Sequence, residues 1–266
     1  MILIYLGVSA VLIAAIERAP QLRFAALSFF RPLFASDALY LATGFVAGTS
    51  ASIAFVLAAS AAVGALGVPR LETLDLPLLA SVPIALVALD LGNYSCHWLL
   101  HRFDPLWELH KVHHSIRQLD WLATFRSHLL EQTLRRLLAP IGLILLGVPV
   151  AAVAAAGAIF NGWAILNHAN LALDLAFLEP VFVTPRLHRS HHAAATTHRN
   201  LGTVFSVWDR LRGALVVEDL TPATPFGVPG EVESYPQGWG RQLVEPLRRI
   251  FARSRGTVLA PETART

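Results

Sequence analysis

Two long intervals of this chain carry no charged side chain. The first separates Asp37 from Arg70, and the second separates Arg136 from Asp174. Each interval is longer than the roughly 20 residues that an α-helix needs to cross the hydrocarbon core of a bilayer. The composition agrees, because charged residues make up 15% of the sequence, whereas soluble domains carry roughly a quarter. The sequence therefore predicts an all-α integral membrane protein.

The apolar segments predict about three membrane spans and a helical hairpin. The spans are expected at residues 2–16, 38–69 and 76–96. A single helix over 137–173 would be roughly 55 Å long, which exceeds the bilayer core, so this interval has to break. The sequence Gly147-Val148-Pro149 lies where the break is needed. A hairpin there also keeps the histidines before it and after it on one face of the membrane.

The basic residues give the predicted orientation. Twenty of the 21 lysines and arginines fall in segments that this topology places on one side, and Arg70 falls on the other. The positive-inside rule makes the arginine-rich side cytoplasmic, together with a histidine-rich helical cap and the C-terminus. These residues are mostly arginines that flank apolar runs, so we expect them to face anionic lipid and not nucleic acid.

We predict a membrane domain over residues 1–220 and a linker and tail over residues 221–266. Proline and glycine dominate the linker to about residue 240. The tail then mixes arginines with apolar residues, which are Leu243, Val244, Leu247, Ile250 and Phe251. This pattern fits an amphipathic helix at the membrane interface. A simple polar tail is the alternative, because Pro246 falls within the segment.

The spacing of the eleven histidines indicates a metal site. Eight of them form three groups: His97 and His101; His110, His113 and His114; and His188, His191 and His192. Residues i, i+3 and i+4 share a helix face, so each group can aim its imidazoles at one point. One structural zinc takes four ligands, so eight to ten histidines imply two ions.

Three histidines stand alone in the sequence. His128 has Arg126 and Glu131 nearby, and His168 lies between Asn167 and Asn170. We expect both histidines to be further ligands, because ligand imidazoles are oriented by polar neighbours. A lone histidine in a membrane protein is more often a packing residue, and this is our expectation for His198.

The ligand types narrow the choice of metal. Imidazole suits iron, zinc, copper and nickel, and the single cysteine, Cys96, provides no thiolate set. The sequence contains neither His-Glu-x2-His nor Glu-x2-His, which argues against a zinc metalloprotease and a ferritin-like bundle. The remaining expectation is an all-nitrogen site for two metal ions.

Asp90 and Tyr94 extend the same helix face toward the membrane. At 100° per residue these two residues lie within roughly 60° of His97 and His101. We expect the Asp90 carboxylate to accept the outer N–H of a ligand imidazole and to fix its tautomer. The alternative is an acid that only packs against a neighbouring helix.

These motifs together resemble the fatty acid hydroxylase/sterol desaturase superfamily over about residues 77–216. The similar positions are Asp90, Tyr94, His97-x3-His101-Arg102, His110-x2-His113-His114, Arg126-x-His128-x2-Glu131, Asn167-His168-x-Asn170, His188-x2-His191-His192, Asn200-x-Gly202 and Trp208-Asp209-Arg210-Leu211. The resemblance implies a membrane-embedded di-iron oxygenase whose ligands are the eight grouped histidines, with His128 and His168. Two positions depart from the family pattern: Leu201 replaces a usual Tyr, and Arg212 replaces a usual Phe.

The expected reaction is hydroxylation or desaturation of a fatty acyl, sterol-like or carotenoid-like lipid. A lipid C–H bond offers no acidic proton, so its oxidation needs a metal that activates O2. No nucleotide-binding fingerprint occurs, so we expect electrons from a ferredoxin- or cytochrome-type protein that docks on the arginine-rich face. Two irons are the expected cofactor, and zinc or another metal can replace them in isolated protein.

Two other functions use histidines in membranes. A metal transporter would line a path across the bilayer with them, and a haem electron carrier would use two facing histidines. The first is disfavoured because the predicted histidines gather at one face and none lies in the first two spans. The second leaves most of the grouped histidines without a role.

Overall fold

The computed structural model describes residues 2–67, 70, 71, 74 and 76–254. Within these residues the chain forms helices and loops, with three isolated β-bridges and no β-sheet, so the all-α prediction is confirmed. Thr73, in the loop predicted to lie opposite the histidines, and the last twelve residues of the predicted tail lie outside the described part.

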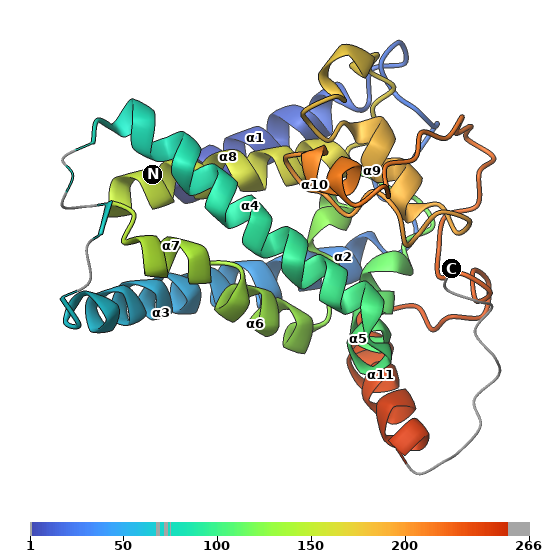
Figure 1. The fold of residues 1–266 in the computed structure, drawn as a ribbon. Coiled ribbons are helices and arrows are strands. Elements are labelled where there is room, and N and C mark those ends of the chain that lie inside the picture. Colours follow the sequence, from blue (N-terminus) through green and yellow to red (C-terminus); the bar gives the residue numbers. More distant parts are fainter. Residues whose placement is uncertain (1, 68–69, 72–73, 75, 255–266) are drawn as a thin grey trace.

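Four long helices form the apolar part of the molecule (Figure 1). They are α1 (Ile2–Ile16), α3 (Ala47–Gly64), α4 (Leu78–Arg102) and α8 (Val150–His168). Helix α8 packs against both α4 and α1. Among the described helices, α4 and α8 are long and apolar enough to cross a membrane, and Gly7–Ile16 and Ser52–Gly64 are shorter apolar helical stretches.

The segment leading into α3 departs from a regular α-helix. Helix α2 (Phe34–Tyr40) continues through the π-helical turn η1 (Leu41–Val46), and α3 follows without a break. The sequence analysis predicted one continuous apolar span there. The π-helical turn packs against α2, α3 and the 3-10 helix η3 (Trp121–Phe125).

The predicted break in the second apolar interval is confirmed. Helix α6 (Leu129–Leu138) leads to α7 (Ile141–Leu146), which ends at Gly147, and α8 begins after Pro149. Gly147 has φ of 60°, a left-handed conformation that glycine adopts without a steric penalty. The start of α6 and the end of α8 therefore lie at the same end of the molecule, next to the end of α4 (Figure 1).

Short helices cover this end of the long helices and form a cap. They are α5 (Asp104–His114), η3, η4 (Ala176–Leu178), α9 (Pro185–His192) and α10 (Val207–Leu211). Buried ion pairs join the cap to α2 and to the segment before it. The Arg31 guanidinium donates to both carboxylate oxygens of Asp120 at 2.7 and 2.6 Å, and Arg126 pairs with Asp37.

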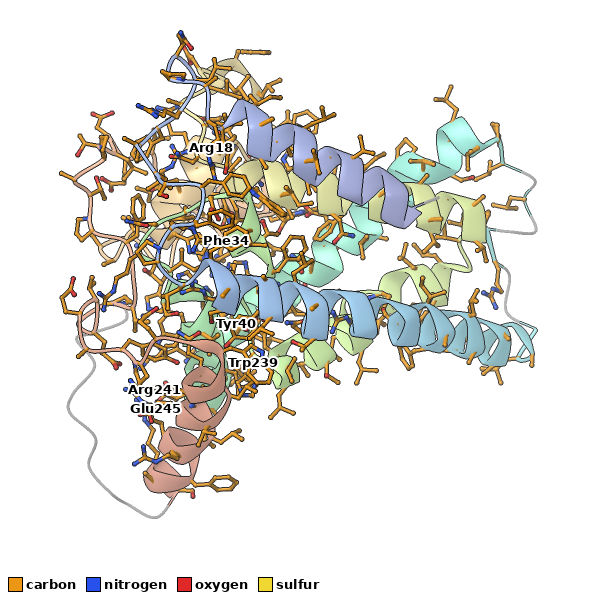
Figure 2. The ribbon with its side chains drawn as sticks, turned by 180° about the vertical axis from the view of Figure 1, so that it is seen from behind. Arg18, Phe34, Tyr40, Trp239, Arg241 and Glu245 are labelled. Carbon is orange, nitrogen blue, oxygen red and sulfur yellow. The ribbon has the colours of Figure 1, made fainter. Side chains whose placement is uncertain are left out.

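Helix α11 (Trp239–Ser254) crosses the direction of the long helices (Figure 2). It packs against α5 through polar side chains, because Arg253 pairs with Glu108 at 3.0 Å and Gln242 is fully buried. Val244 and Phe251 remain 55% and 63% exposed on its other side. A helix thus forms where the sequence left a helix and a polar tail as alternatives, and Pro246 lies inside it.

Candidate metal centre

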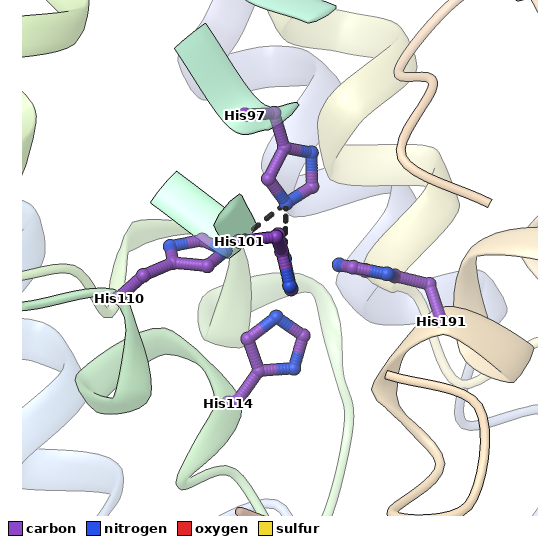
Figure 3. Close-up of side chains that lie close together, drawn as sticks. All are labelled: His97, His101, His110, His114 and His191. Atoms are coloured by element: carbon purple, nitrogen blue, oxygen red, sulfur yellow. Dashed lines mark hydrogen bonds between the residues drawn. The ribbon is translucent and has the colours of Figure 1, made fainter. Parts of the chain in front are cut away.

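Nine buried histidines form two groups among the residues that the structure describes. The first group is His97, His101, His110, His114 and His191, and the second group is His113, His168, His188 and His192. In each group, one ring nitrogen per residue lies within 4.8 Å of the others. Figure 3 shows the first group, whose rings converge from helices α4, α5 and α9. The arrangement therefore provides two separate sites of four or five imidazoles.

Each predicted histidine triplet divides between the two groups. Helix α5 gives His110 and His114 to the first group and His113 to the second. Helix α9 gives His188 and His192 to the second group and His191 to the first. The expectation that every triplet aims at one point is therefore wrong. Residues i and i+4 lie about 40° apart around a helix, whereas the residue at i+3 diverges by about 60° from one and 100° from the other.

The Nδ1 atoms of several rings are held by protein acceptors. His97 donates to the Leu201 carbonyl at 2.8 Å, His113 to the Arg126 carbonyl at 2.9 Å, and His191 to the Arg199 carbonyl at 2.8 Å. A carbonyl only accepts, so each of these Nδ1 atoms carries the proton and each Nε2 presents a lone pair. This is the tautomer that a metal ligand needs.

The inward nitrogens fit bound metal ions. The Nε2 atoms of His97 and His110 are 3.0 Å apart, and those of His168 and His188 are 3.1 Å apart. Two nitrogens that share an ion at about 2.1 Å lie about 3.0–3.4 Å from each other. Among the described residues, no hydrogen-bond partner is found for the buried Nε2 of His191 or for either ring nitrogen of His114 and His192. Buried polar atoms of this kind are normally paired, so the donor set suits a cation.

The electrostatics keep the grouped imidazoles neutral. Burial lowers the pKa of His113, His114 and His192 well below the usual value, and nearby imidazoles lower it further. The pKa of His110 is also lowered by burial, although the Glu131 carboxylate acts in the opposite direction. A neutral imidazole keeps the lone pair that binds a metal.

His168 and His128 have different positions, although the sequence predicted both as ligands. His168 joins the second group from the end of α8, with its Nδ1 bonded to the Ala164 carbonyl at 2.9 Å. His128 lies outside both groups. Its Nδ1 accepts from the Leu130 amide and its Nε2 donates to the Leu243 carbonyl, so both nitrogens are used to hold α6 and α11. The ligand assignment of His128 is corrected accordingly.

His198 is not a member of either group, but it lies against the first one. Its Nδ1 is 3.1 Å from the Nδ1 of His101, on the side of that ring away from His97. His198 was expected to be a packing residue, and this contact was not predicted from the sequence. No spacing signal connects the two residues, because 97 positions separate them.

Asp90 and Tyr94 bond to α10 and the loop before it and not to the imidazoles. The Asp90 carboxylate accepts from the amides of Val204 and Phe205 at 2.9 and 3.0 Å and from Trp208 Nε1 at 2.8 Å. The Tyr94 hydroxyl donates to Asp209 Oδ1 at 3.3 Å. The expected hydrogen bond from Asp90 to a ligand imidazole is thus corrected, because backbone amides occupy its oxygens.

Glu131 makes the contact that was expected of Asp90. Its Oε1 accepts from His110 Nδ1 at 2.8 Å and from Arg135 Nε at 3.0 Å. Burial raises the pKa of Glu131, but His110 and Arg135 outweigh this effect and lower the pKa to about 2. The sequence named Glu131 only as a neighbour of His128. In the sequence, Glu131 stands in the first turn of an amphipathic helix that also carries arginines. This position does not identify His110 as the partner of Glu131.

A cavity of about 190 Å³ reaches both histidine groups. Its wall includes His97 of the first group and His113, His168 and His188 of the second. Side chains of α4, α6, α8 and η3 and of two loops form the rest of the wall, among them Phe160 and Asn161 of α8, which are half-buried. The cavity therefore connects the partly exposed surface of α6 and α8 with the buried imidazoles.

The family model described as fatty acid hydroxylase matches residues 82–214, which is half of the chain. All nine grouped histidines lie within this segment. The chain belongs to the fatty acid hydroxylase family. In this chain, the departure from the family pattern at Leu201 leaves the carbonyl contact with His97 in place, and Arg212 lies 3.9 Å from Asp209.

Two kinds of curated protein are similar to this chain. An ornithine lipid hydroxylase of Rhizobium tropici is 33% identical over 175 residues, which is 65% of the chain and 52% of that relative. Alkylglycerol monooxygenases of Danio rerio and Homo sapiens are 27% and 25% identical over 51% of the chain and 30% of their own lengths. The chain thus spans about half or less of these relatives. No solved structure matches it.

Proposed function

We propose that this chain is an O2-dependent lipid hydroxylase whose two histidine groups each hold an iron ion. The observation that carries this proposal is the pair of buried imidazole groups beside one shared cavity. The similar proteins support the reaction class, because their names describe a lipid hydroxylase and a monooxygenase.

Iron held in these groups would supply the redox chemistry with O2 that breaks an unactivated C–H bond. The chain's own residues do the remaining work. Carbonyls such as Leu201 O and the Glu131 carboxylate orient the imidazoles, and burial excludes water from the rings. The cavity positions the substrate next to both groups.

Hydroxylation converts R–H, O2, two electrons and two protons into R–OH and water. Desaturation uses the same two electrons and releases two waters. The names of the relatives favour hydroxylation. The electrons come, in this proposal, from a ferredoxin- or cytochrome-type protein that docks beside exposed arginines of the cap such as Arg210 and Arg212.

The proposed setting is a membrane with the cap on its cytoplasmic side. Helices α4 and α8 both end at the cap, so their apolar lengths would lie in the bilayer and the histidines at one membrane face. A transporter path would need ligands along the length of the bundle, whereas the two groups lie together at its capped end.

Incubation of purified protein with membrane lipids, a chemical or protein reductant and 18O2 tests the proposal. We expect a lipid product that is heavier by one 18O atom, formed only by iron-loaded protein. An optical spectrum of the same sample should lack a haem Soret band. Iron-loaded protein that consumes reductant without labelling any lipid would contradict the proposed function.

A further inference from the structure

The loop that follows α9 orients two ligands of the first histidine group through its backbone. The Arg199 carbonyl accepts from His191 Nδ1 at 2.8 Å, and the Leu201 carbonyl accepts from His97 Nδ1 at 2.8 Å. Every residue type provides a carbonyl, so these two contacts do not depend on the side chain at either position. They do show that this short segment lies directly against the first group.

His198 gives the same loop a third contact with the first group, and this contact is made by a side chain. Its Nδ1 lies 3.1 Å from the Nδ1 of His101. The other ring nitrogen of His101, Nε2, lies 3.1 Å from the Nε2 of His97 and faces the group (Figure 3). His101 is therefore held between the metal site on one side and His198 on the other.

The proton between the two rings has to belong to His101 when His101 binds a metal. A neutral imidazole carries one N–H, and its other nitrogen has the lone pair. If His198 donated to His101, the single proton of His101 would lie on Nε2, and no lone pair would remain for the metal. His198 therefore accepts at Nδ1 and carries its own proton on Nε2.

The surroundings of His198 fix its ring in this position. The fully buried Trp107 ring packs against both imidazoles, with centroid distances of 4.9 Å to His101 and 5.0 Å to His198. The neighbouring Thr197 hydroxyl donates to the Ala193 carbonyl at 2.9 Å, which ties the loop to the end of α9. His198 itself is half-buried. The two Nδ1 atoms are thus kept facing each other by packing and by the loop.

The second group is oriented by other parts of the chain. The Nδ1 atoms of His113 and His168 donate to the carbonyls of Arg126 and Ala164. Neither carbonyl belongs to the loop that carries His198. A change at His198 is therefore expected to act on the first group alone.

We propose that His198 is a positioning residue of the first metal site. It accepts the Nδ1–H of His101 and thereby presents the Nε2 lone pair of His101 to the metal. His198 acts through His101 and is not itself a ligand. This inference rests on the metal ions of the proposed function, and it does not depend on which lipid is oxidised.

Release of iron to a chelator tests the inference at each site separately. The His192→Ala background should keep iron only in the first group, and the His191→Ala background only in the second. Adding His198→Ala should speed iron release about ten- to a hundredfold in the first background, as the loss of a residue that orients a ligand does. In the second background the rate should not change.

Two further variants separate the lost acceptor from a disturbed loop. His198→Gln has an amide oxygen that can accept the same N–H, so iron release should stay within a few-fold of its parent. Thr196→Ala is the control, because Thr196 lies in the same loop, is half-buried and donates only to the Ser190 carbonyl. It should leave iron release unchanged in both backgrounds.

Nitrogen-15 NMR of histidine-labelled, zinc-loaded protein locates the proton directly. Zinc fills nitrogen sites and has no redox chemistry. The signals of His198 are assigned by their loss in His198→Gln. We expect its Nδ1 to be unprotonated and its Nε2 to carry the proton. A side chain that only packs is not required to hold this tautomer, and a proton on Nδ1 would contradict the proposed role.

The outcomes of the release experiment divide in the same way. Equal acceleration in both backgrounds would assign His198 to the stability of the fold. Unchanged release with His198→Ala, or release from His198→Gln as fast as from His198→Ala, would show that no acceptor is needed. Each of these results would overturn the inference and leave the lipid hydroxylase intact. Failure to label any lipid with 18O, with iron release as expected, would contradict the proposed function and leave His198 as a positioning residue.

Discussion

His110 uses one ring nitrogen for the protein and directs the other toward the centre of its group. Its Nδ1 donates to Glu131, and its Nε2 lies 3.0 Å from that of His97. A carboxylate is a stronger acceptor than the carbonyls that hold His97 and His191, so His110 is the most electron-rich imidazole of the first group by this criterion.

Replacing the Glu131 carboxylate by an amide should weaken the first metal site. Glu131→Gln keeps the size of the side chain but loses the charge that supports the His110 N–H. We expect iron to be removed by a chelator about ten- to a hundredfold more readily. His128→Ala on the same helix is the control; it should keep both irons and lose about 1 kcal/mol of stability with the α6 cap. Iron retention in Glu131→Gln equal to that of the control would contradict this role.

Histidine spacing pointed to eight of the nine grouped histidines, and the polar neighbours of His168 pointed to the ninth, but neither predicted the division into two groups. The i, i+4 pairs within 110–114 and 188–192 are visible in the sequence, and the pair members do stay together. Which pair meets His113 or His191 depends on how α5 and α9 face each other, and this is a tertiary property. His128 was expected to be a ligand, but it caps α6 and lies outside both groups. Polar neighbours in the sequence are typical of a helix cap as well as of a ligand.

At the scale of elements, the loop between α9 and α10 is held by side chains from α4. Asp90 accepts three N–H groups from residues 204–208, and Asp209 accepts from Gly202 at 2.7 Å and from Tyr94. The same loop carries Leu201, whose carbonyl orients His97. Asp90 is therefore a positioning residue that acts on the metal site through the loop.

The substitution Asp90→Asn should disturb this loop first and the metal second. An amide has one oxygen where the carboxylate has two, so its NH2 would face either the Val204 amide, or the Phe205 amide together with Trp208 Nε1. Loss of one charged hydrogen bond costs about 1.5–3 kcal/mol, so we expect a lower melting temperature together with reduced turnover per bound iron. Proteolysis of the loop should become faster. An unchanged melting temperature with lowered turnover would contradict action through the loop.

Helix α11 turns Gln242 and the ion-paired Arg249 and Arg253 toward the protein and exposes a mixture of apolar and basic residues. Its exposed residues include Val244 and Phe251 beside Arg241 and Arg248. Because it crosses the long helices, it would lie along the membrane surface if those helices span it (Figure 2).

Charged substitutions on the exposed side of α11 should therefore release it from lipid. In Phe251→Asp we expect the fluorescence of Trp239, compared with a Trp239→Phe blank, to be quenched less by brominated lipid than in the wild type. Arg248→Ala, which keeps the apolar residues, is the control and should show at most a small change. Equal quenching in Phe251→Asp and the wild type would refute an interfacial position.

The element boundaries were predictable where local chemistry decides them. The glycine and proline at 147 and 149 marked the hairpin break, because a left-handed turn and a missing N–H end a helix whatever surrounds it. The π-helical turn at Leu41–Val46 and the polar contacts of α11 were not predictable, because they follow from packing against η3 and α5.

At the scale of the molecule, the metal centre lies at one end of the apolar bundle. The predicted topology places that end in the cytoplasm, with the loop around residues 65–77 outside. A cysteine introduced at Leu66 should react with an impermeant maleimide added to intact cells, in a Cys96→Ser background. A cysteine at Gly240 should react only after the cells are opened. Labelling at Gly240 in intact cells, with labelling at Leu66 only in opened cells, would mean the opposite orientation. Labelling of both positions in intact cells would contradict a bundle that spans the membrane.

The central claim is that two separate histidine groups each hold one iron. The most direct test is the iron content per chain of the wild type, His191→Ala and His192→Ala, measured on folded protein. We predict about two irons in the wild type and about one in each variant, because His191 belongs to the first group and His192 to the second. A single iron in the wild type, or two irons in both variants, would contradict the claim.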